Sequence, residues 1–285
     1  MKIAVTTASG LLGSSIIKHL IPESGAENVI GIARSPEKIR HLNIEVKKGD
    51  YNSKADFEDA LIGVDAVLLV SGNDPPDKRI LQHRNVIEAA KINGIKKIVY
   101  TSIFGAEKGN AFSPIVASNR QTEKDIQDSG LMWAIGRNGI YVEPDLEYIE
   151  NYKKEGAITN CAAEGKCGYT SRNELALAYS ELLLKDRLAG KTYNLFGTPI
   201  TQERLTTAIN NHFNTNLKYV NIEPNEYMRQ RKGELGSFLG TIIAGIYTGI
   251  KTGAFDGKSH FEKVTGRPHK TIDQMIEDFM ADAPR

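Results

Sequence analysis

The first half of the chain alternates short apolar runs with longer segments that repeat apolar residues at helical spacing. The short runs are continuously apolar rather than alternating, which is typical of strands buried on both faces. Such strands form parallel sheets between two layers of helices. The pattern predicts strands at Lys2–Thr6, Val29–Ala33, Glu45–Lys48, Ala66–Val70, Lys97–Thr101 and Met132–Gly136.

Helical periodicity fills the gaps between these strands. The predicted helices are Leu11–Leu20, Pro36–Leu42, Ala55–Leu61, Gln82–Asn93 and Thr122–Ser129. Repeated strand–helix–strand units indicate an α/β fold, a doubly wound parallel Rossmann sheet, which binds dinucleotides at the carboxyl ends of its strands.

The second half is less regular. Thr192–Phe196 predicts one more strand, which we expect to return to the main sheet, and Arg172–Lys185 and Gln202–Phe213 predict amphipathic helices. From Glu223 onward the pattern is helical with glycine interruptions. We therefore expect an NAD(P)-binding Rossmann domain over residues 1–150 and a smaller, mostly helical substrate-binding part over residues 151–285.

Composition narrows the class of protein. The 285 residues are 40% hydrophobic with a formal net charge of +1, so no strong field favours nucleic acid or an acidic membrane surface. The chain starts directly in a strand pattern without a signal peptide, and its longest apolar run, Phe238–Ile250, is too short to span a bilayer. We expect a soluble, cytoplasmic protein with a small-molecule substrate; a homodimer stays open.

Two sparse cysteines, Cys161 and Cys167, and six histidines without ligand spacing predict neither a disulfide framework nor a metal site. His83 is expected to be a structural histidine or to orient the loop after the fourth strand. The glycine-punctuated segment around Phe238–Ile250 fits a buried helix, an apolar pocket wall or a dimer contact.

A glycine-rich loop follows the first strand. Thr7, Ala8, Ser9, Gly10, Leu11, Leu12 and Gly13 have the layout of a dinucleotide loop, with Thr7 at the first glycine position. Gly10 would let backbone amides approach a pyrophosphate at the positive end of the helix, and Gly13 would let the helix pack closely. A turn with positive φ would strain Thr7 by about 1–3 kcal/mol, whereas a turn with negative φ would accept it and let its hydroxyl cap the helix.

The end of the second strand selects the cofactor. An acidic residue there would bind the ribose of NAD, but the chain has Arg34, whose planar fork suits a 2′-phosphate. Lys38 lies one helical turn further on. We expect NADP(H), with Asp50 after the third strand as a candidate contact to the adenine edge or as ordinary turn chemistry.

Several blocks together are similar to a known family. ASGLLG, ARSPEK, GDY, QHRNVIEAAKINGIKKIVYTS, RNGIYVE, TSRNELALAY and KTYNLFG resemble the NmrA-like branch of the atypical short-chain dehydrogenases, and most of all its quinone and triphenylmethane dye reductases. The resemblance covers nearly the whole chain. It implies a Rossmann domain, a small C-terminal domain, and a nicotinamide in the cleft between them.

Cofactor contacts can be carried over from the family by position. They fall on Thr7–Leu12, on Arg34, on Ser71, Gly72 and Asn73 after the fourth strand, on the segment from Asn138 through Gly139 and Tyr141 to Glu143, and on Tyr169–Leu175 with Arg172. Two positions depart from the family pattern: Thr7 replaces a glycine, and Asn119 stands where relatives often have a histidine.

The catalytic residues are less clear than the cofactor contacts. A tyrosine–lysine pair spaced by four residues is expected in reductases that protonate a carbonyl, but Lys124 is preceded at that spacing by Arg120. Quinone or dye reduction mainly needs stacking, exclusion of water, and hydrogen-bond donors to the reduced acceptor. Thr101, Ser102, Asn119 and Tyr141 are the candidate donors, each with a purely structural alternative.

These observations favour an oxidoreductase that transfers hydride from NADPH to a quinone or similar planar electrophile. A non-enzymatic regulator that senses NADP remains an alternative, since the tyrosine is missing. An isomerase or reductase of another small substrate is a third.

Overall fold

The apolar runs of the sequence become the strands of one central sheet. In the computed structural model, which describes residues 1–282, seven parallel strands pair in the order β10–β6–β5–β4–β1–β2–β3. Their bounds are β1 (Ile3–Val5), β2 (Val29–Ala33), β3 (Glu45–Lys48), β4 (Ala66–Val70), β5 (Lys97–Ile103), β6 (Met132–Asn138) and β10 (Lys191–Leu195). The strand order reverses at β1, which places a ligand crevice at the carboxyl ends of β1 and its neighbours.

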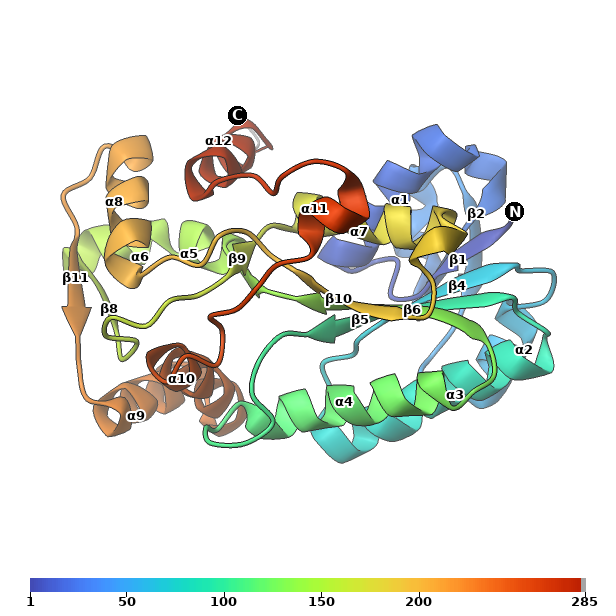
Figure 1. The fold of residues 1–285 in the computed structure, drawn as a ribbon, viewed down its shortest axis with the longest axis horizontal. Helices are drawn as coiled ribbons and strands as arrows, with labels where there is room; N and C mark the ends of the chain where they lie inside the picture. Colours follow the sequence, from blue (N-terminus) through green and yellow to red (C-terminus); the bar gives the residue numbers. More distant parts are fainter. Residues whose placement is uncertain (283–285) are drawn as a thin grey trace.

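Helices cover both faces of this sheet (Figure 1). They are α1 (Leu11–Ser24), α2 (Lys54–Ala60), α3 (Pro76–Ile92), α4 (Ser113–Gln127) and α7 (Arg172–Leu184). α1 and α7 pack together on one face, and α2, α3 and α4 pack side by side on the other. Strands β1, β2 and β4 are buried at every position, as continuously apolar runs require. The predicted fold class is confirmed.

Two helices begin earlier than the apolar pattern predicts. α3 starts at Pro76 rather than Gln82, and α4 starts at Ser113 rather than Thr122. Both first turns contain a proline, which a helix tolerates there because the missing N–H has no intrahelical acceptor. The segment Pro36–Leu42, predicted as a helix, is a 3-10 helix.

Strand β10 returns from the second half of the chain to the main sheet, where Lys191 lies opposite Ala134 of β6. Because α7 also packs on this sheet, residues beyond 150 complete the dinucleotide-binding core. The predicted division of the chain near residue 150 therefore stays a proposal about two functional parts.

Most of the remaining elements gather at the carboxyl end of the sheet (Figure 1). They are α5 (Glu143–Glu147), α6 (Ile149–Glu155), β8 (Ala157–Asn160), α8 (Gln202–Phe213), β11 (Lys218–Asn221), α9 (Pro224–Leu235), α10 (Ser237–Lys251) and α12 (Ile272–Asp282). Helix α11 (Phe261–Thr265) instead packs on α7 and β10. β8 and β11 form a small parallel sheet, and α9 packs on α10.

The glycine-punctuated segment is helix α10. A side chain at Gly245 would collide with the backbone at Phe112, so this glycine lets α10 pack directly on the chain segment before α4. One side of α10 is buried, whereas Ile242, Ile246 and Tyr247 are partly exposed. No helix within residues 1–282 is long and apolar enough to cross a membrane.

Candidate cofactor and active site

The loop between β1 and α1 turns through a left-handed residue at Thr7, whose φ is 47°. The Thr7 carbonyl accepts a 2.8 Å hydrogen bond from the Gly10 amide, which closes the turn. A Cβ on Gly13 would lie 2.5 Å from the same carbonyl oxygen, so only glycine lets α1 start this close to the loop. Gly10 is the N-cap of α1 and no side chain of residues 1–282 caps the helix, so the alternative of a capping Thr7 hydroxyl is wrong.

The helix end presents free donors. The Gly10 amide is already occupied by Thr7, but among residues 1–282 no acceptor is found for the amides of Leu11 and Leu12. Unpaired amides at the positive end of a helix form an anion site. The residues present therefore fit a pyrophosphate, with Leu11 and Leu12 rather than Gly10 as the expected amide donors.

Replacing Thr7 with glycine tests the strain in this turn. A β-branched residue in the left-handed region is strained by about 1–3 kcal/mol, so Thr7→Gly is expected to raise the free energy of unfolding by about 1 kcal/mol. Since the folded loop already has this conformation, NADPH affinity should change by less than about threefold.

Chemical denaturation and calorimetric titration of the Thr7→Gly variant measure both quantities. Asn43→Gly is the matched control, because Asn43 has φ of 52° and asparagine tolerates this region better. A stability gain at residue 43 equal to that at residue 7 would contradict a specific strain at Thr7.

Two free cations follow β2. Arg34 and Lys38 are both exposed, and in the described part of the chain neither side chain forms a hydrogen bond or an ion pair. Unpaired cations beside the expected ribose position suit a 2′-phosphate, for which the arginine fork offers two parallel hydrogen bonds. This arrangement supports the assignment of NADP(H).

The turn after β3 is internally bonded. Asp50 accepts hydrogen bonds from the backbone and side-chain amides of Asn52, so its carboxylate already has turn partners, and its adenine contact stays a prediction. The Tyr51 hydroxyl bonds Thr6 and the Val70 carbonyl, which joins this turn to β1 and β4. Gln82, which the sequence reasoning missed, has a buried carbonyl oxygen near Gly72 and Tyr51, and the described residues provide no hydrogen-bond partner for it.

The loop after β4 is held from three directions. The Ser71 amide donates to Thr101 Oγ1 at 2.8 Å, and the Ser71 hydroxyl donates to Asn119 Oδ1 at 3.1 Å. The Gly72 amide donates to His83 Nε2 at 3.2 Å. Burial lowers the pKa of His83 to about 3, so the ring is neutral and can accept this bond. His83 is structural and also orients the loop, so both of its expected roles hold together.

Two candidate catalytic residues are enclosed in protein. The Ser102 hydroxyl donates to Glu123 at 2.6 Å, and Asn119 Oδ1 accepts bonds from Tyr100 and Ser71; each residue is 2% exposed. Thr101, at 3% exposure, is likewise engaged with Ser71. Their hydrogen bonds hold the surrounding loops and strands in place, and their contact with an acceptor stays a prediction.

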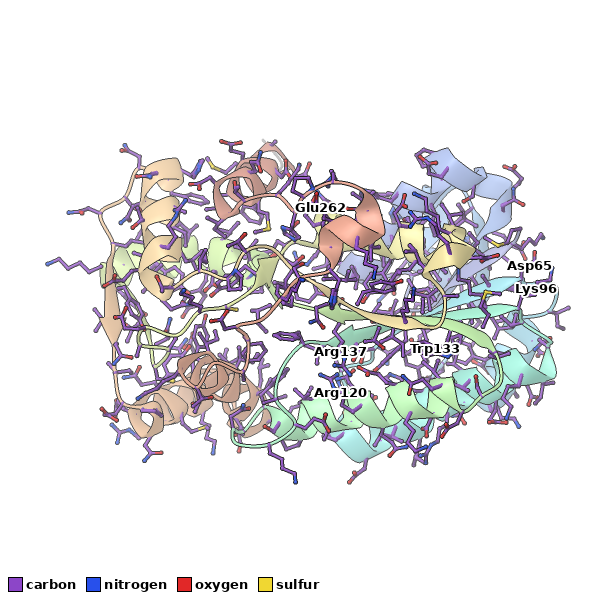
Figure 2. All side chains as sticks on the ribbon, in the orientation of Figure 1. Asp65, Lys96, Arg120, Trp133, Arg137 and Glu262 are labelled. Carbon is purple, nitrogen blue, oxygen red and sulfur yellow. The ribbon has the colours of Figure 1, made fainter. Side chains whose placement is uncertain are left out.

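Glu123 is the centre of a buried charge cluster that the sequence reasoning missed. It accepts two bonds from Arg137, at 2.9 and 2.6 Å, and one from Arg120 at 2.7 Å. Burial favours the protonated carboxyl, but the two arginines hold the pKa of Glu123 below its usual range. Figure 2 shows Arg120 and Arg137 next to each other between α4 and the sheet. Lys124 is exposed and pairs with Asp128. Arg120 and Lys124, which occupy the tyrosine and lysine positions of a reductase dyad, are therefore both paired with carboxylates.

Residues after β6 meet the start of α7 through a short parallel pair. β7 (Ile140–Tyr141) pairs with β9 (Tyr169–Thr170), which brings two predicted cofactor segments together. A side chain on Gly139 would collide with Gly168, so glycine is required where the two segments cross. Asn138 donates from Nδ2 to the Tyr141 hydroxyl at 3.2 Å, and its Oδ1 accepts from Tyr179.

Glu143 and Arg172 continue this contact. One carboxyl oxygen of Glu143 accepts the Arg172 amide at 2.6 Å, while the other is buried without a partner within residues 1–282. Burial raises the pKa of Glu143, which favours its neutral form. The Arg172 side chain pairs with Glu147 at 2.9 Å.

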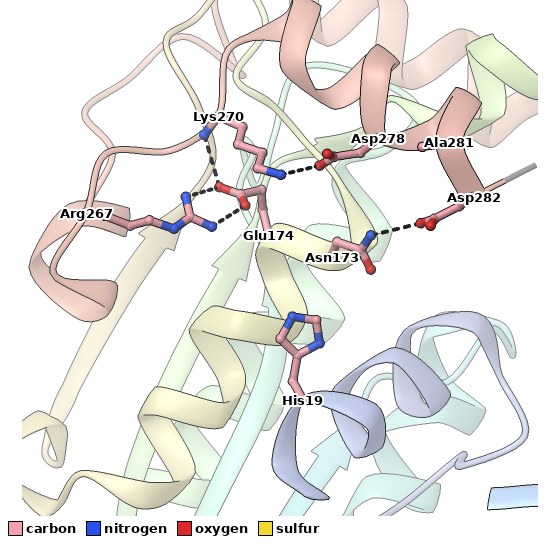
Figure 3. Close-up of a pocket in the computed structure, with 8 residues that line it drawn as sticks. All are labelled: His19, Asn173, Glu174, Arg267, Lys270, Asp278, Ala281 and Asp282. Atoms are coloured by element: carbon pink, nitrogen blue, oxygen red, sulfur yellow. Dashed lines mark hydrogen bonds and ion pairs between the residues drawn. The ribbon is translucent and has the colours of Figure 1, made fainter. Parts of the chain in front are cut away.

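A surface pocket of about 260 Å³ lies behind the start of α7 (Figure 3). Its polar side chains mainly bind one another: Glu174 pairs with Arg267, and Lys270 pairs with Asp278. The pocket therefore fixes the α7 end that carries Arg172, and its geometry gives no separate ligand site. Within residues 1–282, no group of three or more histidine, cysteine, aspartate or glutamate side chains could hold a metal ion.

Comparison with known proteins agrees with this geometry. A family model described as NAD(P)H-binding matches residues 7–184. Quinone oxidoreductase 2 of Escherichia coli (strain K12) is 31% identical, over 96% of this chain and 97% of that protein. An NmrA-like family domain-containing oxidoreductase of Aspergillus flavus is 27% identical, over 86% of this chain and 83% of its own length.

Solved structures extend the comparison to the fold. The triphenylmethane reductase of Citrobacter sp., in complex with NADP(H), is 29% identical and superposes with a TM-score of 0.89. The superposition covers 97% of this chain and 99% of that one. The predicted family resemblance is confirmed: the chain belongs to the NAD(P)H-binding, NmrA-like family of oxidoreductases.

Proposed function

We propose that this NAD(P)H-dependent oxidoreductase reduces quinones or similar planar electrophiles, with NADPH as its preferred cofactor. Quinone oxidoreductase 2 and triphenylmethane reductase, the relatives named above, suggest this class of acceptor. Bound NADPH supplies the hydride. The observation that carries the proposal is the hydroxyl of Tyr141 at the junction of the predicted cofactor segments, for whose hydrogen residues 1–282 offer no acceptor.

The chain's own residues would act by positioning and by donating one hydrogen bond. The Leu11 and Leu12 amides bind phosphate, and Arg34 with Lys38 binds the 2′-phosphate. The loop Ser71–Asn73, held by Thr101, Asn119 and His83, supports the nicotinamide end. A planar acceptor needs stacking and exclusion of water more than an acid–base pair.

Partly exposed apolar side chains offer the stacking surface. Ile103 ends β5 and Phe104 follows it, Ile115 lies on α4, and Ile246 lies on α10, all within one hydrophobic cluster. On α4, Asn119 is enclosed and donates to the Ile115 carbonyl. The residue four before Lys124 is Arg120, which disfavours a mechanism with a tyrosine and a lysine on α4.

Tyr141 is the proposed donor to the oxygen that gains negative charge. Its hydroxyl oxygen accepts from Asn138, whereas no acceptor for its hydrogen is found among residues 1–282. Burial raises the pKa of Tyr141, so the phenol stays protonated and able to donate near neutral pH. A fixed donor at a developing oxyanion lowers the barrier to hydride transfer.

Tyr141→Phe is expected to lower kcat with a benzoquinone by about 10- to 100-fold and to leave NADPH affinity nearly unchanged. The measurement is NADPH oxidation at 340 nm with a panel of benzoquinones and triphenylmethane dyes, together with calorimetric titration of NADPH. Tyr219→Phe is the control, because that hydroxyl bonds Asn160 in the small β8–β11 sheet.

If the wild-type protein binds NADPH but oxidises it with no acceptor in the panel, the reductase proposal fails and the sensor alternative is favoured. If Tyr141→Phe keeps full turnover, Tyr141 is not the donor. The cytoplasmic location and the homodimer stay predictions within this proposal.

A further inference from the structure

Arg79, on the first turns of α3, is a buried arginine. Its side chain donates from Nη1 to the Gly72 carbonyl at 3.1 Å, and from Nη2 to Ser118 Oγ at 2.6 Å and the Ile115 carbonyl at 3.3 Å. The residue is 5% exposed. These bonds join α4 to the loop after β4, which is the loop that the proposed function places at the nicotinamide end of the cofactor.

The charge of Arg79 has no opposite charge beside it. All three acceptors are neutral, Nε has no partner, and no carboxylate of residues 1–282 forms an ion pair with it. Arg120 and Arg137, by contrast, share the carboxylate of Glu123. Burying an unpaired charge is strongly unfavourable, whereas the guanidinium stays protonated under all ordinary conditions.

The field of this charge already affects its surroundings. Burial is the main cause of the low pKa of His83, and the positive charge of Arg79 lowers it further. His83 is thereby kept neutral, so Arg79 is the buried positive charge in direct contact with Gly72. A cationic ring brought to the same loop would experience the same repulsion.

We propose that Arg79 makes the site prefer the reduced cofactor over the oxidised one. The nicotinamide ring is neutral in NADPH and carries a positive charge in NADP⁺, whereas the phosphates are the same in both. A fixed, unpaired guanidinium near the ring therefore disfavours only the oxidised form. The inference rests on the cofactor placement in the proposed function.

This preference has two consequences for turnover. NADPH replaces NADP⁺ readily after each reaction, and the same positive charge favours an acceptor that has gained negative charge. In the intermediate dielectric of a protein interior, two unit charges ~10 Å apart interact strongly enough to change a binding equilibrium by roughly tenfold. Arg79 is a positioning and selectivity residue, since it contacts the loop and not the reacting atoms.

Calorimetric titration of NADPH and NADP⁺ tests the inference without relying on turnover. The wild-type protein is expected to bind NADPH about tenfold more tightly than NADP⁺. Arg79→Gln removes the charge and keeps a hydrogen-bond donor, so it should bind NADPH and NADP⁺ with nearly equal affinity. Arg79→Lys keeps the charge and should retain the preference for NADPH. Arg84→Gln is the control, because Arg84 lies exposed on the same helix and pairs with Asp125.

The outcomes separate the two claims. Equal wild-type affinities for the two cofactor forms overturn the role of Arg79 even if no variant folds, and leave the reductase proposal standing. If Arg79→Gln and Arg79→Lys both weaken NADPH and NADP⁺ binding by the same factor, the ratio of the two affinities is unchanged. Arg79 is then a purely structural residue, and its proposed role in selectivity is overturned. Absence of binding of either cofactor to the wild-type protein overturns the proposed function together with this inference.

Discussion

Arg34→Glu is expected to weaken NADPH binding by about 100-fold or more while changing NADH affinity by less than about fivefold. Arg34 is exposed, follows β2 directly, and has no partner within residues 1–282, so its fork is free for a 2′-phosphate. A glutamate there would repel the phosphate and could instead accept a hydrogen bond from the 2′-hydroxyl of NADH. Calorimetric titration with both cofactors measures the two affinities.

Arg40→Glu makes the same charge change at another exposed arginine of the segment Pro36–Leu42. It should leave the ratio of NADPH to NADH affinity within about threefold of the wild-type value. An equal loss of NADPH and NADH affinity in Arg34→Glu would show that Arg34 does not read the 2′-phosphate.

Gly13→Ala is expected to abolish tight cofactor binding, with an affinity loss of about 100-fold, and to lower the free energy of unfolding by about 2 kcal/mol. The added Cβ would lie 2.5 Å from the Thr7 carbonyl oxygen and 3.2 Å from the Ala8 Cα. Both neighbours are backbone atoms, so the loop itself must move. The Leu11 and Leu12 amides would then no longer point to a common anion position.

Gly233→Ala is the matched control in α9, because a Cβ at Gly233 would meet no atom within 4 Å. Chemical denaturation should show this variant to be unchanged or slightly more stable, as expected for alanine in a helix. If Gly13→Ala binds NADPH like the control, the close packing of α1 against the loop is not what shapes the phosphate site.

The inner strands of the sheet could be predicted from the sequence because they are continuously apolar. Val29–Ala33 and Ala66–Val70 agree with the structure at both ends. The edge strand Glu45–Lys48 also agrees, although it is polar. The glycine loop was recognised from its place between a strand and a helix, and Arg34 from its place after the second strand. Each of these depends on residues that are neighbours in the chain.

The parts that escaped prediction depend on contacts between distant residues. Arg79 and Gln82, which the sequence reasoning missed, lie on the buried face of α3 together with His83 and Val86, a spacing that marks polar residues at core positions. That spacing could have indicated Arg79, but its lack of a counter-charge is visible only when α4 and the Gly72 loop are placed around it. Similarly, Ser102 and Asn119 had suitable chemistry, and only their partners showed that both are enclosed.

β10 is synthesised well after its neighbour β6, and this order affects how the nascent chain folds. β10 is one of the two edge strands, and among the described strands it pairs with β6 alone, so one side of β6 has no hydrogen-bonding partner until Lys191–Leu195 has left the ribosome. An open strand edge on a nascent chain is a site for pairing with other chains. Fragments that stop short of residue 191 would keep that edge open and tend to aggregate, even though they contain the entire phosphate loop.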